Sequence, residues 1–284
     1  FGPTQMIQQT KRHVEFPVFN SPEEMINALS LQMQFHARRK EKKEEEPVNP
    51  PTDINREKAR SWMQDKLGDY GEEALELLDT YGIPAVQSGV AADAREALEL
   101  ASQIGYPLVM KVVSPDALHK SDAGGVLLDI DTDEQVEAGF EKIRQNLFRY
   151  NPQAHFGGIR VQKMAPEGFD LFVGGKNDPS FGPVVFFGMG GVYVEVFQDV
   201  ANILCPARAK NVGILFEELK ASKILKGLRG REAGDIEAFI DLVSRTSHLL
   251  ADYPGIKELD INPVRVLNKG KGVLALDARV RIAL

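Results

Sequence analysis

The sequence has little of the chemistry that marks secreted, membrane-spanning or nucleic-acid-binding proteins. Its 284 residues include one cysteine, Cys205, so no internal disulfide can form and a reducing, cytoplasmic location is expected. No apolar run approaches the ~20 residues that a membrane span requires, so we expect no membrane association. Basic residues are outnumbered, with 34 Lys and Arg against 41 Asp and Glu, and the net charge of −7 argues against nucleic acid as a partner.

The remaining composition is ordinary for a folded protein. Hydrophobic residues make up 43% of the chain and charged residues 26%, which is enough apolar material for a sizeable core. At about 150 residues per domain, this length predicts one or two domains. No internal repeat of fixed period is present, so solenoid and propeller architectures are not expected.

The first fifty residues differ in character from the rest. Ser21-Pro22-Glu23-Glu24 combines a hydroxyl at the N-cap, proline at the first helical position and a carboxylate at the third, and therefore predicts the start of a helix. That helix runs into a charged segment at residues 38–46, where no apolar side chain is available to bury, so a solvated helix end is favoured over a binding patch. Pro47, Pro50 and Pro51 then stiffen the chain, and we place a module boundary there.

Beyond this boundary, helical and strand patterns are interleaved. A helix is expected over residues 58–81, because Gly82 and Pro84 follow it as stop signals. Other helices are expected at residues 94–104, 132–147, 212–226 and 233–253. Strands are expected at residues 107–113, 126–131, 159–163, 169–173 and 184–187, with a final hairpin of residues 258–266 and 273–280. Interleaved elements with hairpin-like strand pairs predict an α/β to α+β class.

Lys111 stands in the middle of the apolar strand at residues 107–113. Burial of an unpaired ammonium group is costly, so the lysine either points into solvent from an edge strand or faces a site where it holds phosphate oxygens. The next loop favours the second interpretation, because it concentrates His119 and Lys120 with Gly124 and Gly125, whose backbone N–H groups can approach a phosphate closely. With an ordinary pKa of about 6.5, His119 could act as a base or nucleophile. A polar turn with a solvent-exposed histidine is the alternative.

The C-terminal hairpin suggests a metal site. If Val266 pairs with Val273, Asn262 falls directly opposite Asp277. Side chains paired across a hairpin have Cβ atoms ~5 Å apart, so an amide oxygen and a carboxylate would converge. Oxygen ligands suit Mg²⁺, which commonly takes one or two protein ligands together with phosphate and water.

Alternation along the same hairpin gathers further carboxylates. Residues 258–262 alternate polar and apolar side chains, so Glu258 and Asp260 share the face of Asn262. The alternative is a polar strand surface that faces solvent. Like charges at Glu258, Asp260 and Asp277 would repel one another without a cation, and this favours the metal interpretation.

Five segments in fixed order carry a family resemblance. They are IGYPLVMK (104–111), SPDALHKSDAGGV (114–126), DPSFGP (178–183), ELDINP (258–263) and LDAR (276–279). Together they resemble the ATP-grasp part of the ADP-forming acyl-CoA synthetases, such as acetate–CoA ligase (ADP-forming), and more distantly the succinyl-CoA synthetase β subunit. The resemblance covers residues 58–282.

The resemblance implies a particular organisation. It implies an ATP-grasp domain at residues 58–284, in which a small lobe (about 85–163) and a large lobe (about 58–84 plus 164–284) clamp a nucleotide. Residues 1–46 resemble the C-terminal tail of an upstream CoA-ligase region, followed by a linker at residues 47–57. The chain is then expected to be a piece of a longer protein, which suits its start at Phe1. CoA-binding domains of the same or a partner chain would supply the acid and CoA sites, and the intact protein is expected to be oligomeric.

The resemblance also implies roles for individual residues. ATP or ADP would contact residues on both sides of the connection between the lobes, namely Lys111, Gly124, Gly125, Gln162, Lys163, Met164 and Asp170. Asn262 and Asp277 match the family's Mg²⁺ ligands. His119 matches the histidine that carries a phosphoryl group between distant sites, and Asp260 could orient its imidazole. The implied reaction is acyl-CoA + ADP + phosphate ⇌ acid + CoA + ATP.

Three departures from the family pattern keep a second function open, and one of them is the segment PARAKN (206–211), which lacks the more usual threonine/aspartate pattern. Asp170 stands where relatives often have glutamate, and Lys163 stands where many have glutamate as well. A chain with these changes could bind ATP without running the full cycle, as a non-catalytic or regulatory module of a larger protein such as a bacterial protein-lysine acetyltransferase. A different ATP-grasp ligase is a third interpretation, but such enzymes generally use an acyl-phosphate and have no need of the His119 loop. The acyl group and the choice between ATP and GTP stay open.

Overall fold

The structure is a computed structural model that describes residues 17–44, 48–71, 73–117, 120, 122–190, 199–227 and 232–283. The chain divides into two compact units, residues 1–49 and residues 50–284. In the first unit, α2 (Pro22–Glu44) begins where the capping pattern predicts, and the Ser21 hydroxyl accepts a hydrogen bond from the Glu24 N–H at 3.2 Å. Its apolar side chains are exposed, with Met33 at 73% and Ile26 at 60%. Among the described residues, no helix is long and apolar enough to cross a membrane.

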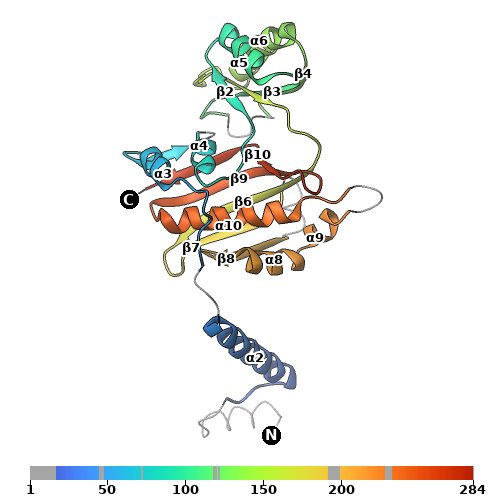
Figure 1. Ribbon diagram of the computed structural model, residues 1–284. Helices are drawn as coiled ribbons and strands as arrows, with labels where there is room; N and C mark the ends of the chain where they lie inside the picture. The colour runs from blue at the N-terminus through green and yellow to red at the C-terminus, as the bar shows by residue number, and fades with distance from the viewer. Residues whose placement is uncertain are drawn as a thin grey trace. The chain divides into compact units, whose positions relative to one another are not determined.

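The second unit contains a large antiparallel sheet in the order β1-β11-β9-β6-β7-β8, with β10 paired to β9. Its strands are β1 (Gly68–Tyr70), β6 (Phe169–Asp178), β7 (Gly182–Met189), β8 (Val200–Leu204), β9 (Ile256–Val266), β10 (Val273–Ala275) and β11 (Ala278–Ile282). Helices α8 (Ala209–Glu218), α9 (Lys220–Leu225) and α10 (Ile236–Asp252) cover one face of this sheet (Figure 1). Phe187 of β7 packs there against Phe239 of α10, which also contacts Phe216 of α8.

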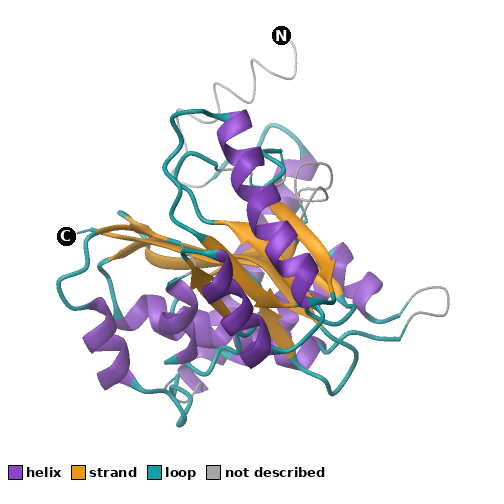
Figure 2. Cartoon of the chain, turned by 90° about the horizontal axis from the view of Figure 1, so that it is seen from above, coloured by secondary structure: helices purple, strands orange, loops and turns teal. Residues whose placement is uncertain are grey.

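A smaller sheet has the order β2-β5-β3-β4 and is also antiparallel. Its strands are β2 (Ser88–Ala91), β3 (Leu108–Val112), β4 (Val126–Ile130) and β5 (Ile159–Lys163). Helices α5 (Ala94–Ile104) and α6 (Asp133–Tyr150) flank its strands (Figures 1 and 2). The N-terminus of each helix is capped by a side chain: Asp93 accepts from the Glu96 N–H, and Thr132 accepts from the Gln135 N–H. This sheet and its helices form a second hydrophobic core, separate from that of the large sheet.

The predicted single helix over residues 58–81 is wrong. The structure has α3 (Arg56–Met63), then β1, then α4 (Ala74–Asp79) in this segment. Asp65 and Gly68 adopt positive φ angles of 58° and 112°, which a continuing helix cannot accommodate. The backbone of β1 instead pairs with β11. Pairing with a sheet edge therefore outweighs the helical spacing of the apolar side chains.

Two other expectations differ from the structure. The helix predicted at residues 212–226 is divided into α8 and α9, which meet at the extended residue Leu219. The strand β8 was not predicted, because its apolar side chains alternate only over five residues at the edge of the sheet. The other predicted strands and the final hairpin are confirmed, with ends shifted by a few residues.

A buried tyrosine ties the start of the second unit to α10. Tyr81 is fully buried, and its hydroxyl donates to Asp252 Oδ2 at 2.6 Å. Arg56 donates from Nε to the same oxygen at 2.8 Å. Burial, together with the bond to this carboxylate, raises the pKa of Tyr81, so the phenol stays protonated and keeps its role as donor.

Removal of the Tyr81 hydroxyl tests this network. Tyr81→Phe keeps the packing of the ring but removes a donor to a carboxylate, so it should lower the free energy of unfolding by about 1–3 kcal/mol in urea titrations. Tyr70→Phe is the matched control, because that hydroxyl donates to the Leu67 carbonyl at an exposed position. It should cost less than about 1 kcal/mol. Equal losses of unfolding free energy in Tyr81→Phe and Tyr70→Phe would contradict this role of the Tyr81 hydroxyl.

Candidate functional site

The two sheets of the second unit meet where β10 ends. Ala275 forms a bridge with Ala85 just before the small sheet: its N–H donates to the Pro84 carbonyl at 2.8 Å, and its own carbonyl accepts from the Val86 N–H at 3.1 Å. We use "lobe junction" for the polar side chains that meet at this place from the two sheets. They are Lys111, Arg160 and Gln162 from the small sheet, with Asp260, Asn262 and Asp277 from the large one.

The small sheet presents its polar side chains on one face. Ile159 and Val161 of β5 are buried in the core beneath α5 and α6, so the alternating residues Arg160 and Gln162 lie on the opposite face. Lys111 of β3 is paired directly with Arg160. The sequence pattern could have revealed Arg160 by the same alternation, but our prediction included only Gln162 and Lys163 from this strand.

One backbone carbonyl of the hairpin joins the lobes. The Leu276 oxygen accepts from Lys111 Nζ at 3.4 Å and from Gln162 Nε2 at 3.3 Å. Gln162 is only 2% exposed, and its Oε1 is buried without a hydrogen-bond partner among the described residues. Because an unpaired buried acceptor is costly, this oxygen marks a place where a donor from outside the protein could bind.

Charge is concentrated at the junction. Burial lowers the pKa of Lys111, the nearby Asp277 opposes this shift, and Lys120 adds to it. Burial also lowers the pKa of Arg160, and Asp277 again opposes the shift. Lys120 Nζ lies 3.5 Å from Asp277 Oδ2. Lys111, Arg160 and Lys120 of the small lobe therefore all lie near Asp277 of the large lobe.

The predicted register of the hairpin is confirmed. Val266 pairs with Val273, and the Asn262 N–H donates to the Asp277 carbonyl at 3.1 Å. An amide side chain and a carboxylate therefore stand opposite one another, and both offer oxygen donors. Among the described residues, no three His, Cys, Asp or Glu side chains group together as a complete protein cage for a metal. Two oxygen donors without such a cage fit Mg²⁺, which takes its remaining ligands from phosphate and water.

The other two predicted carboxylates of the hairpin, Asp260 and Glu258, differ in their surroundings. Asp260 pairs across the strands with Arg279, and its pKa is raised by burial, lowered by Arg279 and raised again by Asp277. Glu258 instead forms an ion pair with Arg281 at 3.2 Å. The predicted mutual repulsion of three carboxylates is therefore wrong for Glu258, because a cross-strand arginine neutralises it.

The loop between β3 and β4 is described only in part. His119 lies outside the described residues. Gly124 has a positive φ of 60°, and its carbonyl accepts from Asn146 Nδ2 at 2.8 Å. The Gly125 N–H donates to the Lys120 carbonyl at 2.8 Å, and a Cβ at Gly125 would lie 2.5 Å from Val112 Cγ1. The Gly125 N–H is thus bonded within the loop and the glycine permits close packing, while its contact with phosphate stays a prediction.

The connection from the small sheet to the large one also differs from expectation. Lys163 was predicted to contact the nucleotide, but its ammonium group donates to the carbonyls of Gly105 and Tyr106. The Met164 N–H donates to the Pro107 carbonyl at 3.0 Å. These bonds stabilise the connection itself, and the contact of Lys163 with a nucleotide stays a prediction.

Asp170 is engaged in an ion pair. It lies at the start of β6, and Arg265 of β9 donates to both of its oxygens, at 2.6 and 3.3 Å. The predicted contact between Asp170 and a nucleotide therefore requires that the carboxylate be shared with this arginine. The aspartate side chain is one methylene shorter than that of glutamate, so it has little reach to contact Arg265 and a nucleotide at the same time.

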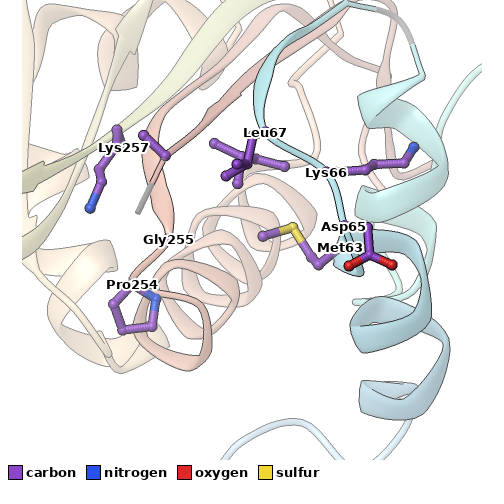
Figure 3. A pocket seen from close by; sticks show the side chains of 9 residues that line it. Met63, Asp65, Lys66, Leu67, Pro254, Gly255 and Lys257 are labelled. Carbon is purple, nitrogen blue, oxygen red and sulfur yellow. The ribbon is translucent and has the colours of Figure 1, made fainter.

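A cavity of about 670 Å³ lies elsewhere on the second unit. Figure 3 shows residues of the α3–β1 loop on one side of it and residues of the α10–β9 turn on the other. Its lining comprises Met63, Asp65, Lys66, Leu67, Pro254, Gly255, Lys257, Ile282 and Ala283. None of the predicted site residues lines this cavity.

Comparison with known proteins agrees with this geometry. A family model described as "ATP-grasp domain" matches residues 62–282. The β subunit of acetate–CoA ligase [ADP-forming] I from Pyrococcus furiosus is 41% identical over 208 residues, which cover 73% of this chain and 89% of that subunit. Acetate–CoA ligase [ADP-forming] I from Archaeoglobus fulgidus is 40% identical over 262 residues, covering 91% of this chain. This chain spans only 38% of the length of that relative.

A solved structure gives the same result. Acetyl-coenzyme A synthetase 1 of Ca. Korarchaeum cryptofilum, in complex with coenzyme A and Mg-AMPPCP, is 34% identical with a TM-score of 0.69. The match covers 79% of this chain and all of the other. In that structure the phosphohistidine segment points towards the nucleotide binding site. Fold, ordered motifs and relatives thus agree, and the chain belongs to the ATP-grasp domain family, in the branch formed by the ATP-grasp parts of ADP-forming acyl-CoA synthetases.

Proposed function

We propose that this chain binds ATP or ADP with Mg²⁺ at the lobe junction and relays a phosphoryl group for an ADP-forming acyl-CoA synthetase. One observation carries the proposal: cations of the small lobe, Lys111 and Lys120, face the oxygen pair of Asn262 and Asp277 across the junction. A polyphosphate with its metal needs both kinds of group at one place. Cations hold phosphate oxygens, and carboxylate and amide oxygens hold the metal.

The residues at the junction have distinct tasks in this proposal. Lys111 and Lys120 hold phosphate oxygens, while the buried acceptor of Gln162 receives a donor from the base. Asn262 and Asp277 would hold Mg²⁺, which neutralises phosphate charge when it is bound. Because Asp277 is paired with Lys120 in the structure, the ammonium group must exchange this carboxylate for phosphate as the ligand binds.

The relay itself depends on His119. In the transfer from ATP to the histidine, which is the reverse of ATP formation, a bond forms between an imidazole nitrogen and the γ-phosphorus while the bond from that phosphorus to the bridging oxygen breaks, and ADP leaves with that electron pair. Asp260 would accept a hydrogen bond from the second ring nitrogen and so orient the ring. This role of His119 rests on the sequence of its loop and on the Ca. Korarchaeum cryptofilum relative, in which the phosphohistidine segment points towards the nucleotide binding site.

The partner in this proposal is a CoA-binding region of the same or another chain. The match to the A. fulgidus protein extends over 262 residues and so reaches into residues 1–49, whereas the family model begins at residue 62. This supports our assignment of residues 1–46 to the tail of an upstream CoA-ligase region, with residues 47–57 as linker. Formation of acyl-CoA would need that region, so the chain alone would not catalyse it. An oligomeric intact protein and a cytoplasmic location stay predictions.

One observation favours a second function. Asp170 forms an ion pair with Arg265, and the Lys163 ammonium group donates hydrogen bonds to backbone carbonyls. Two positions that the family resemblance assigns to the nucleotide thus have structural bonds here. This arrangement would suit a module that binds nucleotide for regulation and does not transfer phosphate.

Phosphate labelling separates the two functions. With γ-labelled ATP and Mg²⁺, the chain together with its CoA-ligase region should acquire acid-labile, base-stable label, as expected for a phosphohistidine. His119→Asn should abolish the label, whereas His155→Asn, a change on an exposed loop of the same lobe, should leave it intact. An unlabelled wild-type protein would overturn the relay, and label in His119→Asn would overturn the choice of residue.

Removal of the proposed metal ligand gives a further test. Asp277→Ala should weaken ADP binding in the presence of Mg²⁺ by about tenfold or more, as loss of a charged contact implies, while binding in EDTA changes much less. Isothermal titration calorimetry measures both values. Asp79→Ala is the control, because that carboxylate is exposed and pairs only with Lys58 on the surface. If Mg²⁺ still strengthens ADP binding to Asp277→Ala as it does for wild type, Asp277 is not a ligand.

A further inference from the structure

Gly174 is a glycine for which the packing of the described residues gives no reason. It lies in the centre of β6, and its backbone is not in the positive-φ region that favours glycine. Among the described residues, a Cβ at Gly174 would meet no atom nearer than the Leu259 carbonyl oxygen at 3.6 Å, which is an ordinary contact. A Cβ at the next residue, Gly175, would instead lie 2.4 Å from Leu250 Cδ1 of α10. Because a glycine inside a strand weakens it, Gly174 marks a place where a ligand or another segment approaches closely.

The register of the large sheet shows what surrounds this position. Gly175 faces α10, so Gly174 points to the opposite face of the sheet. Gly174 pairs directly with Asp260 of β9 on one side and with Phe186 of β7 on the other, and directly paired residues point to the same face. Adjacent strands are spaced such that β9 and β7 lie about 10 Å apart, with β6 between them. We use "Gly174 slot" for the space above Gly174 between Asp260 and Phe186.

The chemistry of the Gly174 slot fits a flat ring that carries an N–H group. The carboxylate of Asp260 can accept a hydrogen bond from such a group, and the ring of Phe186 offers an apolar wall. The glycine lets the ring lie close to the backbone of β6. An imidazole ring has all of these features. A purine base is also flat, but the proposed function places it beside the open acceptor of Gln162 in the small sheet.

The Gly174 slot lies next to the proposed metal ligands. Asp260 is two residues from Asn262 on the same face of β9, or about 7 Å along the strand. Lys120, which follows His119 in the sequence, reaches this hairpin, with its Nζ 3.5 Å from Asp277 Oδ2. A phosphoryl acceptor in the slot would therefore stand beside the place where the hairpin would hold Mg²⁺ and the terminal phosphate.

We propose that Gly174 is a positioning residue for the phosphoryl relay, because its missing side chain leaves room for the imidazole ring that accepts the phosphoryl group between Asp260 and Phe186. This inference rests on the proposed function and names the place of the acceptor in it. There the ring nitrogen forms its bond to the γ-phosphorus, the bond from that phosphorus to the bridging oxygen breaks, and ADP leaves with the electron pair. The N–H of the second ring nitrogen stays bonded to Asp260.

Side chains of graded size at position 174 test the proposal. The chain together with its CoA-ligase region would be labelled with γ-labelled ATP and Mg²⁺, and the initial rate of phosphohistidine formation measured for wild type, Gly174→Ala and Gly174→Val. We expect Gly174→Val to lower this rate about tenfold to a hundredfold, as for displacement of a reacting group by about 1 Å. Gly174→Ala should lower it less. Affinities for ADP and for AMPPCP, measured by calorimetry with Mg²⁺, should stay unchanged.

Lys176→Val is the matched control. Lys176 is exposed on the same strand and the same face, two residues farther from the metal hairpin, and it pairs with Glu258. This variant should be labelled and should bind nucleotide like wild type. Thermal unfolding of each variant shows whether the fold is retained, and Gly174→Ala, which adds a single methyl group, keeps the test valid if Gly174→Val does not fold.

The outcomes separate this inference from the proposed function. Wild type that acquires no label would overturn the proposed function, and the inference with it. Labelling of Gly174→Ala and Gly174→Val at the wild-type rate would overturn the inference alone. Loss of ADP or AMPPCP affinity in step with the loss of rate would also overturn it, because the slot would then belong to the nucleotide. An equal loss of rate in Lys176→Val would overturn it as well, because the effect would not be specific to the slot.

Discussion

Hydrogen bonds to the backbone carbonyl of Leu276 join the two lobes to one another. This carbonyl accepts hydrogen bonds from the part-buried Lys111 and the buried Gln162, so two side chains of the small sheet bond to the backbone of the large one. The neighbouring residue, Asp277, faces the cations of the same small sheet. Because Leu276 and Asp277 are adjacent, the bonds that position the lobes also place a carboxylate opposite a cluster of positive charge.

This constraint explains why the site uses an antiparallel hairpin. The register between β9 and β10 places Asn262 across from Asp277, and the break between β10 and β11 leaves the Leu276 carbonyl available to the other lobe. Packing of the hairpin against α10 fixes it in the core of the large sheet. A rigid hairpin can hold oxygen donors at a set separation.

Charge balance connects this architecture to the proposed function. Lys111 and Lys120 of the small lobe lie across the junction from Asn262 and Asp277 of the hairpin. A polyphosphate with Mg²⁺ would supply negative charge to the small lobe and positive charge to the hairpin at the same time. The ion pair between Lys120 and Asp277 is then a resting contact that the ligand replaces.

The sequence was sufficient for features that depend on local pattern. The hairpin register followed from alternation and turn position, and α5 and α6 lie close to the helices expected at residues 94–104 and 132–147. The sequence was insufficient where pairing with a distant segment of the backbone determines the local structure. The helix predicted at residues 58–81 gave way to β1 because β11 offered an edge to pair with.

The candidate site shows the same difference between features that follow from local pattern and features that depend on distant residues. Lys163 and Gly125 carry suitable groups for a nucleotide, but carbonyls brought close by the fold take their donors. Arg160 was overlooked although alternation with Gln162 marked its face, because its significance depends on Lys111 from another strand. A residue type in the right segment is therefore weaker evidence than the same residue with its neighbours across the sheet.

A crystal structure of the chain with Mg²⁺ and ADP tests the central claim most directly. The account predicts phosphate oxygens within hydrogen-bond distance of Lys111, and a metal ion at about 2.1 Å from side-chain oxygens of Asn262 and Asp277. Lys120 should have left Asp277 in that structure. A nucleotide bound in the cavity between the α3–β1 loop and the α10–β9 turn, with the Lys120–Asp277 pair intact, would contradict the account.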